Sequence, residues 1–182
     1  MSEQTVIGRR IESALAAYVN KDFETSLLHL FPVLDKTARK RLPKAKVGDR
    51  IRSFIADEED LITYLAIGNV IKGVHSFGVR LPEAIYKYGR CSIEHEGELD
   101  PRLKIIQENR CSIGKEWELP YTFIIAMIMS VILAEENKND ILTRDMYLTF
   151  FDKKFILNML WGQSKKFRND IGLTALMTHQ QV

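Results

Sequence analysis

The chain has 182 residues, of which 46% are apolar and 27% are charged, with a formal net charge of +2 at pH 7. This length and composition are typical of one soluble globular domain and exclude a low-complexity or repeat protein. Cys91 and Cys111 are too few for a disulfide framework and lack the spacing of zinc ligands, so we expect two reduced thiols and no metal or cofactor.

Apolar residues at helical spacing predict three helical regions in the first part of the chain, over about 6–19, 22–42 and 47–71. Asp22 is a typical N-cap for the second region, and Pro32 is expected to kink or split it. The acidic residues 57–60 suit a new helix N-terminus within the third region, because the helix dipole favours negative charge there. The first residues lack the basic and apolar segments of a secretory signal.

Residues 73–78 are expected to connect to a helix over 81–96, in which Pro82 suits the first turn and Gly97 suits the end. At about 100° per residue, a core-facing stripe combines seven positions, namely Leu81, Ala84, Ile85, Tyr88, Cys91, Ser92 and His95. In a straight helix Arg90 lies about 140° around the axis from His95 and about 7.5 Å along it.

Short alternation and turn residues around Asn109 and Gly114 predict a small β-hairpin near residues 103–118. Residues 120–137 form a helix that is apolar on all sides, so it is expected at the centre of a bundle. Its apolar run over 121–134 is shorter than the about 20 residues of a membrane span. Thr143 caps a last long helix that runs through Leu160, and a shorter helix follows to Met177.

The sequence Arg90-Cys91-Ser92-Ile93-Glu94-His95 resembles the Arg-x4-His signature of the HEPN family, which comprises small all-helical domains of bacterial RNase toxins and abortive-infection proteins. The resemblance covers about residues 20–135, with residues 141–177 as additional C-terminal helices. It implies one mainly all-α, HEPN-like domain over 1–182 that acts as a metal-independent endoribonuclease in defence or toxin-antitoxin biology. It also implies a homodimer whose two motif helices line one cleft.

In this interpretation His95 is the general acid or base, and Arg90 stabilises charge on the phosphate. The expected supporting residues are Tyr86, Tyr88, Ser92 and Glu94. Family members usually carry Asn, Asp or His where this chain has Cys91. The alternative is therefore a non-catalytic helical module that binds RNA, a nucleotide or a partner protein, with His95 as a core residue and Arg90 in a surface ion pair.

Basic residues concentrate between positions 36 and 52, opposed only by Asp49. They predict contacts with RNA phosphates or, equally, a solvated helix end. The six candidates for RNA contact are Lys36, Arg39, Lys40, Arg41, Lys44 and Lys46. Tyr86 and Ile93 flank Arg90 on the outer face of the motif helix and favour a covering dimer partner. A cytoplasmic location and an antitoxin or sensor partner complete these expectations.

Overall fold

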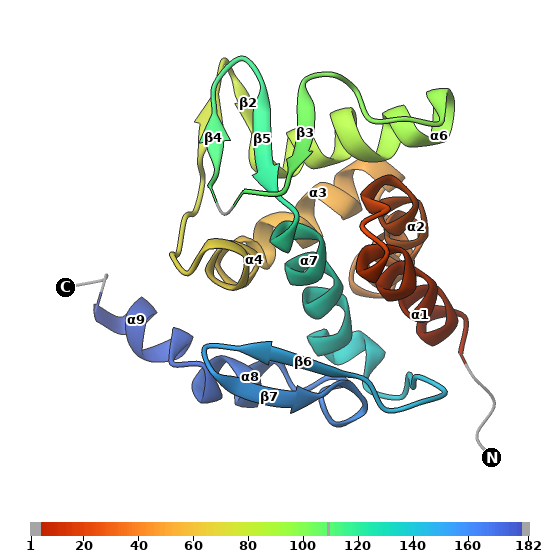
Figure 1. Ribbon diagram of the computed structural model, residues 1–182, viewed down its shortest axis with the longest axis vertical. Coiled ribbons are helices and arrows are strands. Elements are labelled where there is room, and N and C mark those ends of the chain that lie inside the picture. Colours follow the sequence, from red (N-terminus) through yellow and green to blue (C-terminus); the bar gives the residue numbers. More distant parts are fainter. Residues whose placement is uncertain (1–4, 109, 180–182) are drawn as a thin grey trace.

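The computed structural model describes residues 5–108 and 110–179 and shows a mainly helical protein with three small sheets (Figure 1). Four helices form the N-terminal part, namely α1 (Val6–Val19), α2 (Phe23–Arg41), α3 (Val47–Asp57) and α4 (Glu59–Ile67). The Thr5 hydroxyl caps α1 by accepting from the Gly8 amide, and the Asp22 carboxylate caps α2 by accepting from the Thr25 amide. The predicted helices are confirmed, although α2 continues as one element through the exposed Pro32.

The predicted motif helix is confirmed as a continuous run of helical turns, but its middle is not an α-helix. It consists of α5 (Leu81–Ala84), the π-helical segment η1 (Ile85–Cys91) and α6 (Ser92–Glu96). Gly97 ends it with φ of +82°, a conformation that costs glycine little. The expected connector before it contains a two-residue hairpin, β1 (His75–Ser76) and β2 (Val79–Arg80).

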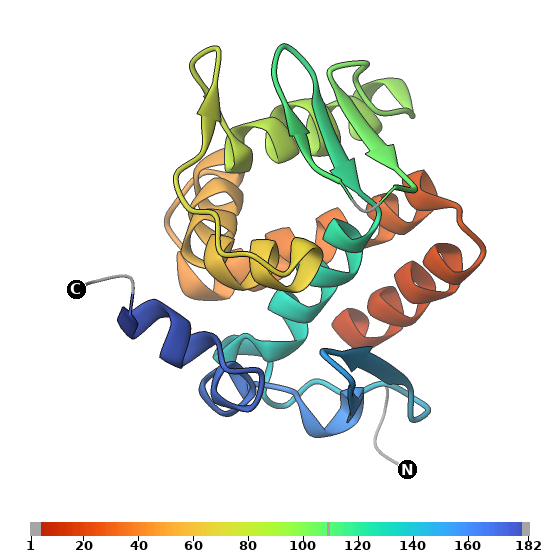
Figure 2. The ribbon, with the colours of Figure 1, turned by 60° about the vertical axis from the view of Figure 1, so that its left-hand side comes forward.

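A three-stranded sheet follows the motif helix and lies beside it, with its strands running across the helix direction (Figure 2). Its strands are β3 (Leu103–Ile106), β4 (Ser112–Ile113) and β5 (Trp117–Pro120), in the order β3-β5-β4. The predicted hairpin is confirmed only in part, because its two expected arms, β3 and β5, are strands but run parallel. The antiparallel hairpin in this segment is β4–β5. The predicted turn at Asn109 and the first four residues lie outside the described residues.

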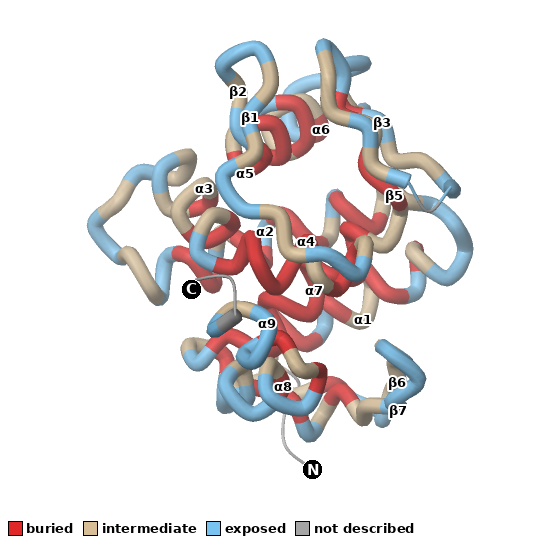
Figure 3. The backbone as a smooth tube through the Cα atoms, turned by 90° about the vertical axis from the view of Figure 1, so that its left-hand side faces the viewer, coloured by how far each residue is buried: buried red, intermediate tan, exposed pale blue. Residues whose placement is uncertain are grey.

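Helix α7 (Thr122–Leu133) is the centre of the molecule, as its uniform hydrophobicity predicts. Every residue from Phe123 to Leu133 is buried, and the helix contacts α1, α2, α4 and α8 (Figure 3). The short 3-10 helix η2 (Glu135–Asn137) ends this segment. No helix in the described part of the chain is both long and apolar enough to cross a membrane.

The long C-terminal helix predicted from Thr143 to Leu160 is wrong. This segment forms the antiparallel strands β6 (Tyr147–Phe150) and β7 (Lys153–Ile156), followed by the 3-10 helix η3 (Leu157–Met159). Exposure alternates from Tyr147 to Phe150, and such aromatic and β-branched residues favour strands when only one face is covered. The sequence predicts one shorter helix after this segment, to Met177, and the structure has two in this place, α8 (Ser164–Asp170) and α9 (Leu173–His179).

Candidate active site

The π-helical segment rotates the end of the motif helix relative to a straight α-helix. A π turn bonds i to i+5 and holds more residues than an α turn, so every later side chain changes direction. Ile93, expected on the outer face, is buried in the core with 5% exposure. His95, expected on the core stripe, is exposed to solvent. Both predictions are wrong for this one reason, and Ile93 offers no apolar surface to a dimer partner.

Arg90 is held by its own helix. Its guanidinium lies 2.7 Å from the Glu94 carboxylate, and the Arg90 side chain is only 18% exposed. The guanidinium also lies 5.9 Å from the centre of the Tyr86 ring. Within the described residues, no hydrogen bond or ion pair joins Arg90 to His95. The structure therefore places the two motif residues on one helix end, with the cation neutralised and the imidazole exposed.

Tyr86 connects the motif helix to α3. Two cations lie near its ring, because the Arg52 guanidinium is 5.1 Å and the Arg90 guanidinium 5.9 Å from the ring centre. The ring packs so closely on Gly48 that a Cβ at that position would lie 2.9 Å from it. Burial raises the pKa of the Tyr86 phenol, and the Cys91 side chain raises it further, while Arg90 and Arg52 oppose the change.

The remaining two supporting residues differ in their surroundings. Tyr88 is buried, and the centre of its ring lies 4.2 Å from the Arg102 guanidinium and 6.0 Å from the Lys87 ammonium. The Tyr88 carbonyl accepts a hydrogen bond from the Asp100 amide at 3.0 Å. Ser92 is half-buried. Tyr88 therefore anchors the helix to the loop before β3 instead of facing a ligand beside His95.

A cavity of about 560 Å³ opens beside the motif helix. It is formed by α3, by the β1–β2 hairpin and by the start of the motif helix, and its nine lining residues are Arg52, Ser53, Ala56, Gly78, Val79, Arg80, Pro82, Glu83 and Lys87. Three of these are cations and one is an acid, which is the balance that attracts phosphate groups. Arg52 bonds to Asp49 at 2.7 Å and to Glu83 at 3.2 Å.

Sequence reasoning missed this cavity. Arg52 lies inside the basic segment that the sequence singles out, but nothing in the spacing pairs it with Arg80 and Lys87, which are about 30 positions away. The buried Glu59 lies behind Arg80, with its Oε2 atom 3.9 Å from that guanidinium and within 2.9 Å of the Gly73 amide. The Oε1 atom of Glu59 is buried and has no hydrogen-bond partner among the residues that the structure describes.

The predicted RNA-contacting residues divide into two groups. Arg41 binds Glu136, Glu58 and Asp57, and Lys40 binds Asp140 and Asn137, so these two residues join α2 to the segment after α7. The other four, Lys36, Arg39, Lys44 and Lys46, are exposed and make no ion pair with any described residue. Only this second group remains available for phosphate contacts.

The part of the chain that the structure describes contains neither a group of metal-binding side chains nor a pair of neighbouring thiols. No three His, Cys, Asp or Glu side chains converge there as a metal ion requires. Cys91 and Cys111 are unpaired, and burial raises the pKa of the Cys111 thiol.

Comparison with known proteins identifies the family. A family model described as Rv1289 matches residues 6–181. The chain belongs to the Rv1289 family. It is 24% identical over 185 residues to the "Uncharacterized protein Rv1289" of Mycobacterium tuberculosis H37Rv, covering 92% of this chain and 88% of that protein. The "Uncharacterized protein Mb1320" of Mycobacterium bovis is similar to the same extent. No solved structure matches this Rv1289-family chain.

Proposed function

We propose that this Rv1289-family protein is a metal-independent endoribonuclease of HEPN type, with Arg90 and His95 in its active site. The observation that supports the proposal is the exposed His95 on the turn after the Arg90–Glu94 pair, at the end of a helix whose other end borders a basic cavity. A π-helical segment runs through this site, and such segments are frequent at functional sites.

The chemistry needs only an acid–base group and a cation. His95 accepts the proton of a ribose 2′-hydroxyl, and the 2′-oxygen then attacks the adjacent phosphorus. The bond from phosphorus to the 5′-oxygen breaks, the leaving oxygen takes up a proton, and a 2′,3′-cyclic phosphate and a 5′-hydroxyl result. Arg90 leaves Glu94 for the phosphate, where it stabilises the charge that develops on the non-bridging oxygens.

The cavity cations Arg52, Arg80 and Lys87 hold the RNA backbone next to this site, through phosphate contacts that do not read sequence. Two protomers pair in this proposal, so that both motif helices border one cleft. An antitoxin or sensor protein controls the cytoplasmic enzyme during defence against phage. Sedimentation at micromolar concentration tests the dimer, and a monomer would remove that part of the proposal.

A second candidate is a non-catalytic module that binds RNA, a nucleotide or a partner protein through the same surface. The Arg90–Glu94 ion pair favours it, because a cation already neutralised is less available to a transition state. Cys91 at the position where HEPN proteins usually carry Asn, Asp or His favours it too.

Cleavage of a mixed RNA pool in EDTA distinguishes the two candidates. The nuclease proposal expects cleavage by the wild type and loss of cleavage in Arg90→Ala and His95→Ala, with folding checked for each. The matched controls are Arg144→Ala and His75→Ala, each of which removes an exposed side chain of the same type that does not line the basic cavity. Intact RNA with the wild type, together with measurable RNA binding, would support the non-catalytic module instead.

A further inference from the structure

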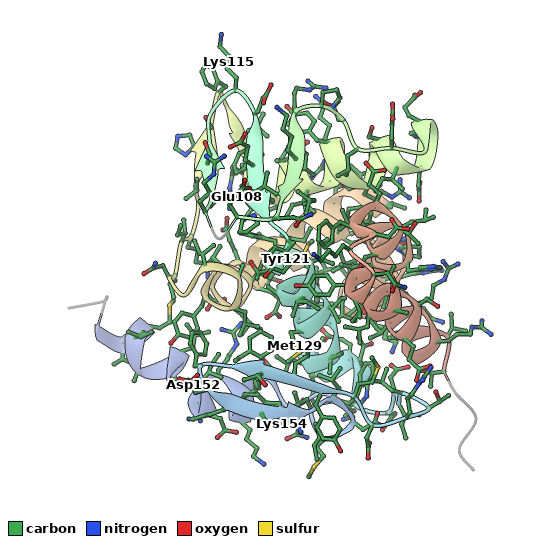
Figure 4. All side chains as sticks on the ribbon, in the orientation of Figure 1. Glu108, Lys115, Tyr121, Met129, Asp152 and Lys154 are labelled. Carbon is green, nitrogen blue, oxygen red and sulfur yellow. The ribbon has the colours of Figure 1, made fainter. Side chains whose placement is uncertain are left out.

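Three aromatic rings meet where the end of α1, the start of α2 and the start of α7 come together. Tyr18 comes from the end of α1, Phe23 from the start of α2, and Tyr121 from the junction of β5 and α7, where Figure 4 labels it. The ring centres of Tyr18 and Phe23 lie 5.9 Å and 5.8 Å from that of Tyr121, and 5.9 Å from each other. The Tyr121 ring is within 29° of parallel to both of its neighbours.

These rings line a cavity of about 250 Å³. The other lining residues are Val19, Lys21 and Gln107. Sites for drug-sized ligands measure about 300–1,000 Å³, so this cavity suits one flat ring system and not a whole dinucleotide cofactor. All three aromatic residues are half-buried, so their rings are ordered by contacts and still reachable from solvent.

The polar groups at the rim match the edge and the charge of a nucleotide. The Gln107 amide offers a donor and an acceptor side by side, as a base edge requires. The Lys21 ammonium offers a positive charge, and neither side chain has a hydrogen bond or an ion pair with any described residue. Lys21 has φ of +61°, a strained conformation for a residue with a side chain.

A second cavity of about 480 Å³ shares Lys21 and Phe23 with the first. It extends along the loop before β3, where Asp22, Glu24 and Asp100 contribute carboxylates and Lys104 contributes a second ammonium. Asp22 also caps α2, Asp100 also binds Arg102, and Lys104 is paired with Glu116, so Lys21 is the cation left for a phosphate. Carboxylates accept hydrogen bonds from ribose hydroxyls, so a sugar attached to a base in the first cavity finds suitable partners here. The two cavities together therefore have room for a base and for the sugar and phosphate that it carries.

We propose that the Tyr18–Phe23–Tyr121 cavity binds one nucleobase by stacking, with Lys21 on the attached phosphate. The base comes either from a free nucleotide or from a single-stranded RNA, since both present the same flat ring and the same phosphate. The site is separate from Arg90 and His95, and the proposal does not depend on RNA cleavage.

Calorimetric titration with AMP, ribose 5-phosphate and hexa-adenylate tests the proposal. Wild-type protein binds AMP and does not bind ribose 5-phosphate, because stacking supplies most of the affinity. Tyr121→Leu and Phe23→Leu each weaken AMP binding by about 5- to 150-fold, the range of one lost base–aromatic contact. Tyr147→Leu, an exposed aromatic on β6, leaves the affinity unchanged. Tighter binding of hexa-adenylate than of AMP identifies an RNA strand as the ligand, and equal binding identifies the nucleotide.

Lys21→Gly separates the charge from the fold. Glycine relieves the positive φ, so the variant is at least as stable as the wild type, yet it loses affinity for AMP and keeps its affinity for adenosine. Absence of AMP binding at millimolar concentration in the wild type, or equal affinity in folded Phe23→Leu and the wild type, would overturn the proposal.

Discussion

Arg90 and Glu94 form a 2.7 Å ion pair one turn apart on the motif helix, so the cation proposed to meet a phosphate is already bound to a carboxylate. Phosphate binding has to displace Glu94. We expect Glu94→Gln to raise the affinity for single-stranded RNA, by roughly 1.5- to 5-fold, because a partly exposed ion pair contributes only about 0.2 to 1 kcal/mol. Fluorescence anisotropy at one fixed salt concentration measures this, since the affinity depends on salt.

Glu96→Gln is the matched control, because it makes the same change of charge two positions away on the same exposed helix end. An equal rise in affinity for Glu96→Gln would mean that net charge, and not release of Arg90, is responsible.

The rotation imposed by the π-helical segment has a direct test in stability. Ile93 is buried with 5% exposure and His95 is exposed, whereas a straight helix would reverse the two. Ile93→Ala should lower the free energy of unfolding by about 2 to 4 kcal/mol, since it leaves a cavity in the core. His95→Ala should change it by no more than about 0.5 kcal/mol. Urea denaturation of both variants measures the two effects. A larger loss of stability for His95→Ala than for Ile93→Ala would contradict the rotation and favour a straight α-helix.

The periodicity of apolar residues was sufficient to predict the regular α-helices of the fold. It predicted α1, α2, α7 and the extent of the motif helix, because their apolar residues repeat at the spacing of an α-helix. It failed at the π-helical segment. Gly89 of this segment packs so closely on Phe31 of α2 that a Cβ would lie 2.9 Å from that ring, a tertiary contact that no local pattern records. Periodicity failed again over 147–156, where aromatic spacing fits a helix and a hairpin equally, and packing of Phe150 and Phe155 on Phe167 decides.

The candidate site was predictable to the extent that it lies on one element. Arg90 and Glu94 lie four positions apart on one helix, and this spacing alone favours their ion pair. The contribution of Arg52 and Arg80 was not predictable, since it requires α3 and the β1–β2 hairpin to lie beside the motif helix. The same limit applies to Arg41, whose partner Glu136 is 95 positions away.

A buried ion network joins α8 to the junction of α3 and α4. The Arg168 guanidinium donates to Asp60 at 2.8 Å and to Glu58 at 2.9 Å, and both carboxylates are almost fully buried. Removing the cation leaves two buried acids with fewer partners. We expect Arg168→Met to lower the free energy of unfolding by about 2 to 4 kcal/mol.

The matched control for this change is Lys166→Met on the exposed side of the same helix, with an expected effect within about 0.5 kcal/mol. Urea denaturation compares the free energies of unfolding of the two variants, with the slope of that free energy against urea concentration unchanged. Similar small losses in both would show that the network adds little to stability.

The same network makes stability depend on pH through Asp60. Burial raises the pKa of this carboxyl, but hydrogen bonds and charge from Arg168, with the Leu61 amide, outweigh burial and hold the pKa below its usual value. The unfolded chain therefore binds the proton more readily than the folded protein. The stabilisation is complete above the unfolded pKa of about 3.9 and is lost as pH falls through the lower folded pKa.

Equilibrium unfolding of the wild type and Asp60→Asn between pH 6 and pH 2 measures this contribution as a difference. The gap between the two free energies of unfolding should be constant above about pH 5 and should shrink below about pH 4. When Asp60→Asn is made in the Arg168→Met variant, the corresponding gap should shrink by less over the same pH range. In that variant Asp60 has lost the cation that lowers its pKa. A gap that stays constant down to pH 2 would contradict a lowered pKa and would indicate that Asp60 acts only through its packing.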